Sequence, residues 1–303
     1  MKPNTLEKIR SDLRLVIEAG GSEPSISMSA AARGIGVSVT AVSQFLSAKY
    51  QGDNDRLAEK VHSWLQRQAE KRQYTEILRQ TILTGAVKRL MQTARACHIQ
   101  RDIGVATGQA GVGKTRACKL YAKQNPDVIL IETMPYYTAR YLMADIHRGV
   151  GYNGVGTVIN MTNDVIDKLK DSGRLIIIDE AEHLPYKALE LIRRLYDKAG
   201  IGLLLVGMPQ LITNLRGNHG QYRQLYSRIG VHSLIPELAE NDVKALVGSA
   251  IPNSNGVWKN FAGETDNARA LGKLLKHSIQ ISKANDSPVT GPTVQQAKKY
   301  III

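Results

Sequence analysis

The stretch that decides the fold is residues 108–115, which read Gly-Gln-Ala-Gly-Val-Gly-Lys-Thr. This octapeptide matches the pattern GxxxxGK[ST] at every defined position. A short apolar run, residues 103–107, precedes it, and an amphipathic segment follows it, so the motif lies between a predicted strand and a predicted helix. Glycines in this context let backbone N–H groups curl around phosphate oxygens, and the start of the helix adds partial positive charge. The sequence therefore predicts a phosphate-binding loop.

The side chains of the loop indicate which phosphate compound it binds. Lys114 is expected to neutralise the β- and γ-phosphates, and the hydroxyl of Thr115 is expected to ligate Mg²⁺. We therefore predict ATP and Mg²⁺ as cofactors. The residues expected to contact the nucleotide are Gly108, Gln109, Ala110, Gly111, Val112, Gly113, Lys114 and Thr115.

A second part of the site is predicted where an apolar run ends in two acidic residues, Asp179 and Glu180. The preceding Leu175–Ile178 has the composition of a buried central strand, and parallel sheets bind ligands at the carboxyl ends of their strands. We expect Asp179 to hold Mg²⁺ through water. Glu180 is expected to polarise the attacking water, because that step needs a carboxylate beside the γ-phosphate.

The order of the elements predicts the fold class. Short β-rich runs alternate with amphipathic segments, which indicates a parallel α/β sheet flanked by helices. After Pro236 the strand signals disappear, and helices are expected around Glu240–Ala250, Asn267–Lys283 and Thr293–Tyr300. The predicted strands are Ile103–Thr107, Val128–Glu132, Leu175–Ile178, Gly202–Val206 and Val231–Ile235.

The N-terminal part is expected to be all α-helical and to contain a helix-turn-helix between residues 29 and 46. Ala32 is small enough for close helix packing, Gly36 makes the turn, and Ser38 caps the second helix. That helix is expected to present a DNA-reading surface. Its candidate contact residues are Thr40, Ser43, Gln44 and Lys49.

The composition favours a polyanionic partner. The formal net charge is +13 and the isoelectric point is near 9.7, with the positive charge spread along the chain. Such a field favours nucleic acid. Apolar runs are too short to span a bilayer, and the two cysteines lack metal-ligand spacing. We expect a cytoplasmic protein with reduced thiols and no membrane partner.

Several segments carry a resemblance to a known family. They are residues 49–56 with Trp64-Leu65, the phosphate-binding loop, Ile176–Leu184, Ile201–Leu203 and Ser227–Ile229. Together they resemble the target-selecting B proteins of Mu-like phages, a family of AAA+ ATPases related to the ATPase regulators of Tn7-like elements. The resemblance covers most of residues 1–235 and is looser beyond them. It implies three domains: a repressor-like helix-turn-helix domain (1–66), an AAA+ ATPase core (67–235) and a C-terminal helical lid (236–303).

The same resemblance implies two further arginines in the ATPase mechanism. Arg228 lies in the segment where AAA+ proteins carry an arginine finger, which reaches the γ-phosphate held by the neighbouring subunit. Arg269 resembles the sensor-2 arginine of the lid. The strand-end position that usually carries a polar sensor is occupied by Met208, and Gln210 is the nearby polar candidate.

The function implied is ATP-dependent, largely sequence-independent binding of double-stranded DNA. The protein would assemble as a helical homo-oligomeric filament on target DNA and deliver that DNA to a transposase, in the host cytoplasm if a phage encodes it. The family's DNA-contacting loop, residues 149–163, carries no basic residue here, so Arg140, Arg148, Lys168 and Lys170 are the remaining candidates. Two alternatives stay open: a helicase-loader or initiator-type ATPase, and a nucleotide-gated helix-turn-helix transcription regulator.

Overall fold

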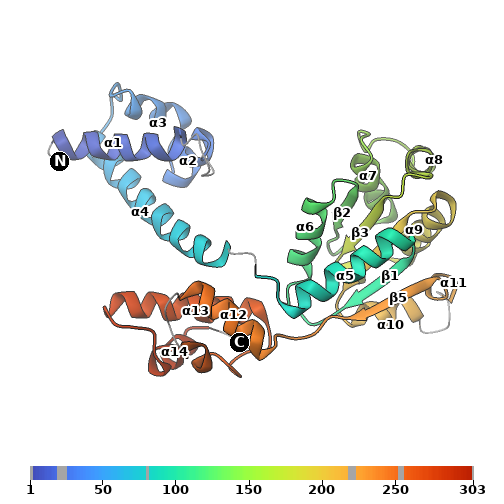
Figure 1. Ribbon diagram of the computed structural model, residues 1–303. Helices are drawn as coiled ribbons and strands as arrows, with labels where there is room; N and C mark the ends of the chain where they lie inside the picture. Colours follow the sequence, from blue (N-terminus) through green and yellow to red (C-terminus); the bar gives the residue numbers. More distant parts are fainter. Residues whose placement is uncertain (1–2, 19–25, 80–81, 218–222, 252–255, 302–303) are drawn as a thin grey trace. The chain divides into compact units, whose positions relative to one another are not determined.

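The computed structural model describes residues 3–18, 26–79, 82–217, 223–251 and 256–301. The chain divides into two compact units, residues 1–80 and 81–303. The first unit contains helices only among its described residues, whereas the second is built around a sheet (Figure 1). Each unit is described by itself below.

The centre of the second unit is a five-stranded sheet in which all strand pairs are parallel. The strand order is β2-β3-β4-β1-β5. The strands are β1 (Ile103–Thr107), β2 (Val128–Glu132), β3 (Leu175–Asp179), β4 (Gly202–Gly207) and β5 (Ile229–Leu234). The parallel α/β sheet expected from the sequence is confirmed. Since all strands run in the same direction, their carboxyl ends share one edge, and the chain segments that follow them meet there.

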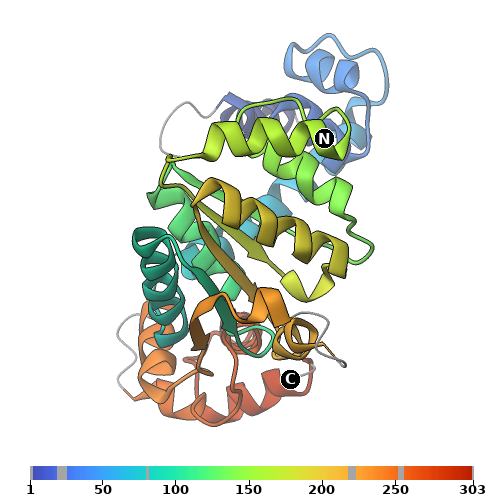
Figure 2. The ribbon, with the colours of Figure 1, turned by 90° about the vertical axis from the view of Figure 1, so that its right-hand side faces the viewer.

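Helices cover both faces of the sheet, because buried side chains alternate between the faces along each strand. On one face Ile176 and Ile178 of β3 pack with α7, α8 and α9. On the other face Leu175 and Ile177 pack with α5 and α6. Figure 2 is seen from the side that α9 covers. The helices between residues 85 and 226 are α5 (Gly85–Gln100), α6 (Lys114–Gln124), α7 (Ala139–Gly149), α8 (Val158–Leu169), α9 (Tyr186–Ala199), α10 (Gln210–Arg216) and α11 (Arg223–Tyr226).

Strand β5 begins two residues earlier than the sequence predicted. Gly230, outside the predicted strand, lies in β5 beside Asp102, where an added Cβ would come within 1.8 Å of a carboxylate oxygen. The register between β1 and β5 shifts at this point, between Ile103 and Gly104. The glycine is thus required by close packing against a side chain that is distant in sequence.

The described residues of the first unit form four helices around one apolar core. Ser27 caps α2, Gly36 ends it in a left-handed conformation (φ +81°), and Ser38 caps α3 by accepting a hydrogen bond from the N–H of Ala41. Gly34 lies against Trp64, so close that an added Cβ would clash with the indole ring. The helices are α1 (Pro3–Glu18), α2 (Met28–Ile35), α3 (Val39–Leu46) and α4 (Asn54–Arg79).

The C-terminal segment, residues 236–303, is helical in its described part and belongs to the second unit. One contact ties it to the start of α5: a carboxylate oxygen of Asp242 accepts a hydrogen bond from the N–H of Gly85 at 3.0 Å. The elements are α12 (Glu240–Ala250), η2 (Val257–Asn260), α13 (Ala268–Ala284) and α14 (Gly291–Lys298).

Candidate nucleotide-binding site

The loop between β1 and α6 has the backbone conformation of a phosphate cradle. Gly111 and Gly113 have positive φ angles of +81° and +109°, a region that L-residues with a side chain rarely adopt. Helix α6 begins at Lys114, and no side chain caps its first turn. Its first backbone N–H groups are therefore available to an anion, as the motif predicted.

Lys114 folds back over the loop. Its Nζ donates hydrogen bonds to the carbonyl oxygens of Gly108 at 2.7 Å and Gln109 at 2.8 Å. Burial lowers the pKa of Lys114 below its usual value, and the negative charges of Glu182 and Asp179 oppose that shift. The ammonium group is thus partly desolvated and close to the loop that it would leave to reach a phosphate.

The end of β3 places Asp179 on the same edge of the sheet as the loop. Its side chain is buried, and Oδ1 accepts a hydrogen bond from the N–H of Glu180 at 3.0 Å. Burial raises the pKa of the Asp179 carboxyl, although a hydrogen bond from the Thr115 hydroxyl and the one from Glu180 oppose the shift. The turn is fixed by Thr133, whose hydroxyl donates to the carbonyl oxygens of Asp179 and Glu180. Sequence reasoning missed Thr133, because its position at the end of β2 carries no motif.

Glu180 differs from Asp179 in exposure. It adopts a left-handed conformation (φ +57°), and its side chain is 54% exposed and lies 3.7 Å from His183. The bend after Asp179 therefore turns the Glu180 carboxylate toward solvent at the mouth of the site, where it can meet a ligand from outside.

One cavity of about 560 Å³ brings these groups together. Arg269 of the C-terminal segment lines it too, and the backbone N–H of Arg269 donates to the carbonyl oxygen of Gly111 at 3.2 Å. The structure therefore unites the loop, the acidic strand end and the lid arginine singled out from the sequence. The lining residues are Ala110, Gly111, Gly113, Lys114, Thr115, Arg116, Lys119, Asp179, Glu180, Glu182, Met208, Ala268 and Arg269.

The donor set fits a magnesium nucleotide. Asp179 Oδ2 is buried and has no hydrogen-bond partner among the described residues. A hard divalent cation prefers such oxygen ligands, together with a hydroxyl such as that of Thr115. Lys114 and Arg269 add the positive charge that a triphosphate needs. The cavity therefore contains suitable groups for both the metal and the phosphates.

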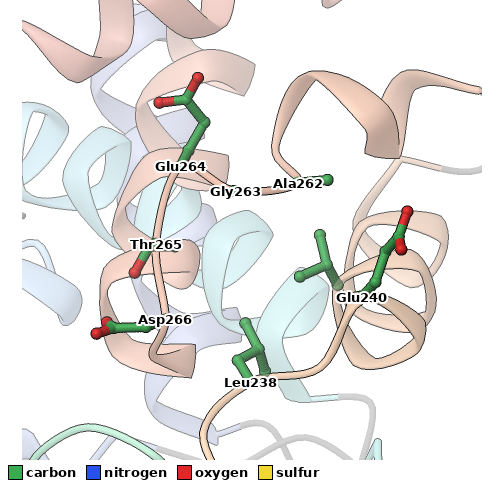
Figure 3. Close-up of a pocket in the computed structure, with 8 residues that line it drawn as sticks. Leu238, Glu240, Ala262, Gly263, Glu264, Thr265 and Asp266 are labelled. Atoms are coloured by element: carbon green, nitrogen blue, oxygen red, sulfur yellow. The ribbon is translucent and has the colours of Figure 1, made fainter.

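A second cavity, of about 630 Å³, lies in the C-terminal segment, and its charged lining residues are acidic (Figure 3). Its lining includes the acidic residues Glu240, Glu264 and Asp266 and no lysine or arginine. Glu264 is already paired with Lys298 at 2.6 Å. This cavity is unsuited to phosphate, whereas the cavity at the sheet edge carries the basic residues Lys114 and Arg269 and is the candidate nucleotide site.

Comparison with known proteins agrees with this chemistry. Residues 97–215 match the family model described as an AAA domain. The chain is 29% identical over 234 residues to the Mu-like prophage FluMu DNA transposition protein B of Haemophilus influenzae, covering 74% of this chain and 80% of that protein. It is 27% identical over 281 residues to the ATP-dependent target DNA activator B of Escherichia phage Mu, covering 91% and 88%.

The protein is an ATPase with an AAA domain. Over most of its length it is similar to the Mu transposition B proteins. Solved structures share the fold of the AAA domain at low identity. The ORC2 protein of Aeropyrum pernix aligns with a TM-score of 0.53 at 17% identity, over 73% of this chain and 70% of that chain. The RuvB branch migration motor of Thermotoga maritima aligns with a TM-score of 0.51 at 14% identity, over 71% and 68%.

Arg228 lies away from the nucleotide cavity of its own AAA domain. It directly precedes β5, whose first residue, Ile229, pairs with Ile103 at the start of β1. The phosphate-binding loop follows the other end of β1. Arg228 Nε donates to Asp197 Oδ1 of α9 at 2.7 Å, and its side chain is 37% exposed. It is therefore at the opposite edge of the sheet from the loop.

Three predicted residues of the loop do not line the cavity: Gly108 and Val112 are buried, and Gln109 is exposed. Gln210 starts α10, bonds Asn214 and does not line the cavity, whereas Met208 does. Arg148 is paired with Asp145. The candidate DNA-contact residues Thr40, Ser43, Gln44, Lys49, Arg140, Arg148, Lys168 and Lys170 are all exposed. Among the described residues, no helix is long and apolar enough to cross a membrane.

Proposed function

We propose that this ATPase is an ATP-dependent DNA-binding protein that selects target DNA for transposition. It binds double-stranded DNA largely without regard to sequence, assembles on it as a filament and presents it to a transposase. The observation that carries the proposal is the cavity uniting Lys114, Asp179 and Arg269, in a chain similar to proteins named as DNA transposition protein B and ATP-dependent target DNA activator B.

The nucleotide chemistry assigns a role to each residue of the cavity. Lys114 exchanges its two loop carbonyl partners for the β- and γ-phosphates. Thr115 and Asp179 hold Mg²⁺, which supplies charge neutralisation at the terminal phosphates. Glu180 takes the proton of the attacking water, for which its exposed position at the mouth of the cavity is suitable.

Arg228 acts on the nucleotide of a neighbouring subunit. The length of β1 separates Arg228 from its own loop by about 13 Å of strand, which is longer than an arginine side chain. An arginine at this edge completes a site only if a second copy of the chain brings its cavity there. In the single chain the Arg228 side chain is hydrogen-bonded to Asp197. In the assembly, the γ-phosphate of the neighbouring subunit replaces Asp197 as its partner.

The proposed function divides the chain into three domains. Residues 1–66 form a helix-turn-helix domain that contacts DNA through α3, residues 67–235 form the ATPase core, and residues 236–303 form the lid. The first of these borders falls inside α4, which belongs as a whole to the first compact unit. Arg269 of the lid acts as the sensor that responds to the nucleotide, supported by its backbone contact with Gly111. The net charge of +13 favours contacts to the DNA backbone. We place this activity in the cytoplasm of the host cell.

Electron microscopy of the protein with random-sequence duplexes of increasing length tests the proposal. With a non-hydrolysable ATP analogue, the covered length should grow in proportion to the DNA, and without nucleotide the DNA should stay bare. Lys114→Ala is the matched control, and it should leave the DNA bare under both conditions. A footprint confined to one short site would instead indicate a transcription regulator. Small closed rings that do not extend along the duplex would indicate a loader or initiator.

A further inference from the structure

Glu182 is a third carboxylate of the nucleotide cavity, and its position is fixed from two sides. It lies in the short 3₁₀ turn η1 (Ala181–His183) that follows β3. Its Oε1 accepts a hydrogen bond from the backbone N–H of Met208 at 3.1 Å. Its backbone carbonyl accepts a hydrogen bond from Nδ2 of Asn214 at 3.1 Å. The side chain is therefore held across the end of β4.

The other oxygen of this carboxylate, Oε2, packs against Gly207 at the end of β4. Oε2 of Glu182 is buried and has no hydrogen-bond partner among the described residues. A buried unpaired carboxylate oxygen is costly, because it has lost water and gained nothing in return. Glu182 also lines the cavity that holds Lys114. An unpaired acceptor in a ligand cavity indicates that a donor arrives with the ligand.

Gly207 determines where this oxygen sits. A Cβ added to Gly207 would lie 2.1 Å from Oε2 of Glu182, so the carboxylate takes the space that a side chain at the end of β4 would fill. The carbonyl oxygen of Gly207 accepts a hydrogen bond from the N–H of Gly108, the first residue of the phosphate-binding loop. Oε2 of Glu182 is therefore beside that loop.

The described residues around Glu182 provide no other buried carboxylate at this end of β4. Met208, the residue that follows β4, offers only a thioether to the cavity. The carboxylate of Glu180 is more than half exposed. Lys114 donates hydrogen bonds to two loop carbonyls, and the negative charge of Glu182 is the largest of those that raise the pKa of Lys114 against the effect of burial. Glu182 thus supplies a carboxylate with one buried oxygen at this strand end.

We propose that Glu182 is a second catalytic carboxylate, whose Oε2 accepts a hydrogen bond from the water that attacks the γ-phosphate. This inference rests on the ATPase roles proposed above. In the step, the water oxygen forms a bond to the γ-phosphorus, and the bond from that phosphorus to the bridging oxygen of ADP breaks. Glu180 takes one proton of the water, and the second O–H stays directed at Glu182. Glu182 thus supplies the polar group that Met208 lacks at this end of β4.

Glu182→Gln is the variant that tests the proposal most directly. The amide oxygen still accepts the hydrogen bond from Met208, and the volume is unchanged. We expect kcat to fall by about 10- to 100-fold, because a neutral amide orients water less strongly. The dissociation constant for ATP should stay equal or fall, since one negative charge near the triphosphate is removed. A merely structural role would leave kcat intact or would weaken ATP binding and lower the melting temperature.

Two further variants separate orientation of water from loss of packing. Gly207→Ala displaces the carboxylate by its added Cβ and should reproduce the slow turnover. Adding Met208→Asn to Glu182→Ala restores a polar group at the same strand end and should recover part of the lost kcat. Glu240→Gln, which removes one charge at the second cavity, is the control and should keep the wild-type rate.

The outcomes distinguish this inference from the function of the whole protein. Wild-type kcat in Glu182→Gln, or weaker ATP binding with an unchanged kcat, overturns the role of Glu182 and leaves the DNA filament proposal intact. Slow turnover in Glu182→Gln, by a protein that fails to cover DNA, supports Glu182 and overturns the filament proposal.

Discussion

The backbone N–H of Arg269 donates a hydrogen bond to the carbonyl oxygen of Gly111 over 3.2 Å. Helix α13 thereby begins directly on the phosphate-binding loop. Its N-cap residue, Asn267, lies so close that a Cβ on Gly111 would come within 2.7 Å of the amide oxygen. The loop is thus covered from the side of the C-terminal segment, and a nucleotide that settles into it must also accommodate α13.

The first prediction concerns Lys114. Lys114→Ala should abolish ATP binding and, with it, stable association with DNA, because this is the loop side chain that directly neutralises the terminal phosphates. Lys119→Ala is the matched control, since Lys119 also lines the cavity but is exposed and paired with Glu132. Binding of labelled ATP to each variant checks this. Unchanged affinity in Lys114→Ala would remove the loop from the site.

Glu180→Gln should bind ATP normally and hydrolyse it slowly. The amide keeps the shape of the side chain but cannot take a proton from water, which typically costs 10²- to 10⁴-fold in rate. Complexes on DNA should therefore last longer than those of the wild type. Phosphate release and the lifetime of DNA complexes are the measurements. A wild-type rate would show that another group takes the proton.

Asp179→Asn should stabilise the nucleotide-free protein. One oxygen of the buried carboxylate has no hydrogen-bond partner within the described part of the chain, and removing such a charge relieves an unfavourable burial of about 1–3 kcal/mol. Each kcal/mol is worth about 2–4 °C in melting temperature at this size. The variant should also lose the extra stabilisation that Mg²⁺ gives in the presence of ATP. Thermal melts with and without Mg²⁺ check both effects.

The sign of the pH dependence follows from the raised pKa of Asp179. Its folded state holds the proton more tightly than the unfolded chain, so ionisation weakens the fold. The penalty is absent below the unfolded pKa near 3.9, grows as the pH rises through the interval up to the folded pKa, and is complete above it. The advantage of Asp179→Asn should accordingly be largest at neutral pH and shrink in acid. An advantage that grows in acid would contradict the assignment.

Arg228→Ala should bind ATP almost normally but lose hydrolysis and filament formation. Fingers that act between subunits contribute about 10³-fold or more to turnover. Arg194→Ala is the control, because Arg194 is exposed on α9 and pairs with Glu190. Mixing Arg228→Ala with Lys114→Ala should restore part of the activity, since one variant supplies the loop and the other the finger. Absence of recovery on mixing would place Arg228 outside a composite site.

DNA binding should depend strongly on salt and little on sequence. The logarithm of the binding constant should fall with the logarithm of salt concentration by about 0.9 for each phosphate contacted. Arg140→Ala should reduce this slope by about 1 if Arg140 contacts a phosphate. Titrations at several salt concentrations, with duplexes of two unrelated sequences, provide the test. A flat dependence, or tight binding to one duplex alone, would favour an operator-binding regulator.

The strands could be predicted because each central one is a continuous apolar run bounded by polar residues. Strands β3 and β4 are apolar on both faces, so they are most stable when helices cover both faces, and all their residues are buried. The predicted positions of Lys114 and Asp179 in one cavity followed from the rule that parallel strands share a carboxyl edge. The meeting of Arg269 with the loop could be expected only from a family resemblance, because no local pattern links residues so far apart.

Glu182 shows where sequence reasoning stops. In the sequence it is a charged residue in the turn after the acidic pair, with nothing to separate it from a solvated side chain. Its position depends on the 3₁₀ turn, on the N–H of Met208 and on the empty space above Gly207. Those are properties of three separate segments brought together by the sheet. The sequence signal that could have drawn attention to it is a glycine at the end of a buried strand.

The hydrogen bond from the Gly85 N–H to Asp242 makes the first turn of α5 sensitive to the position of α12. α5 starts shortly after the point at which the chain passes from its first unit to its second. If nucleotide moves α12, the amide of Gly85 loses its acceptor, at a cost of about 1 kcal/mol, and its hydrogen exchange accelerates. Hydrogen exchange at Gly85 thus reports, within the second unit, whether occupancy of the cavity displaces α12.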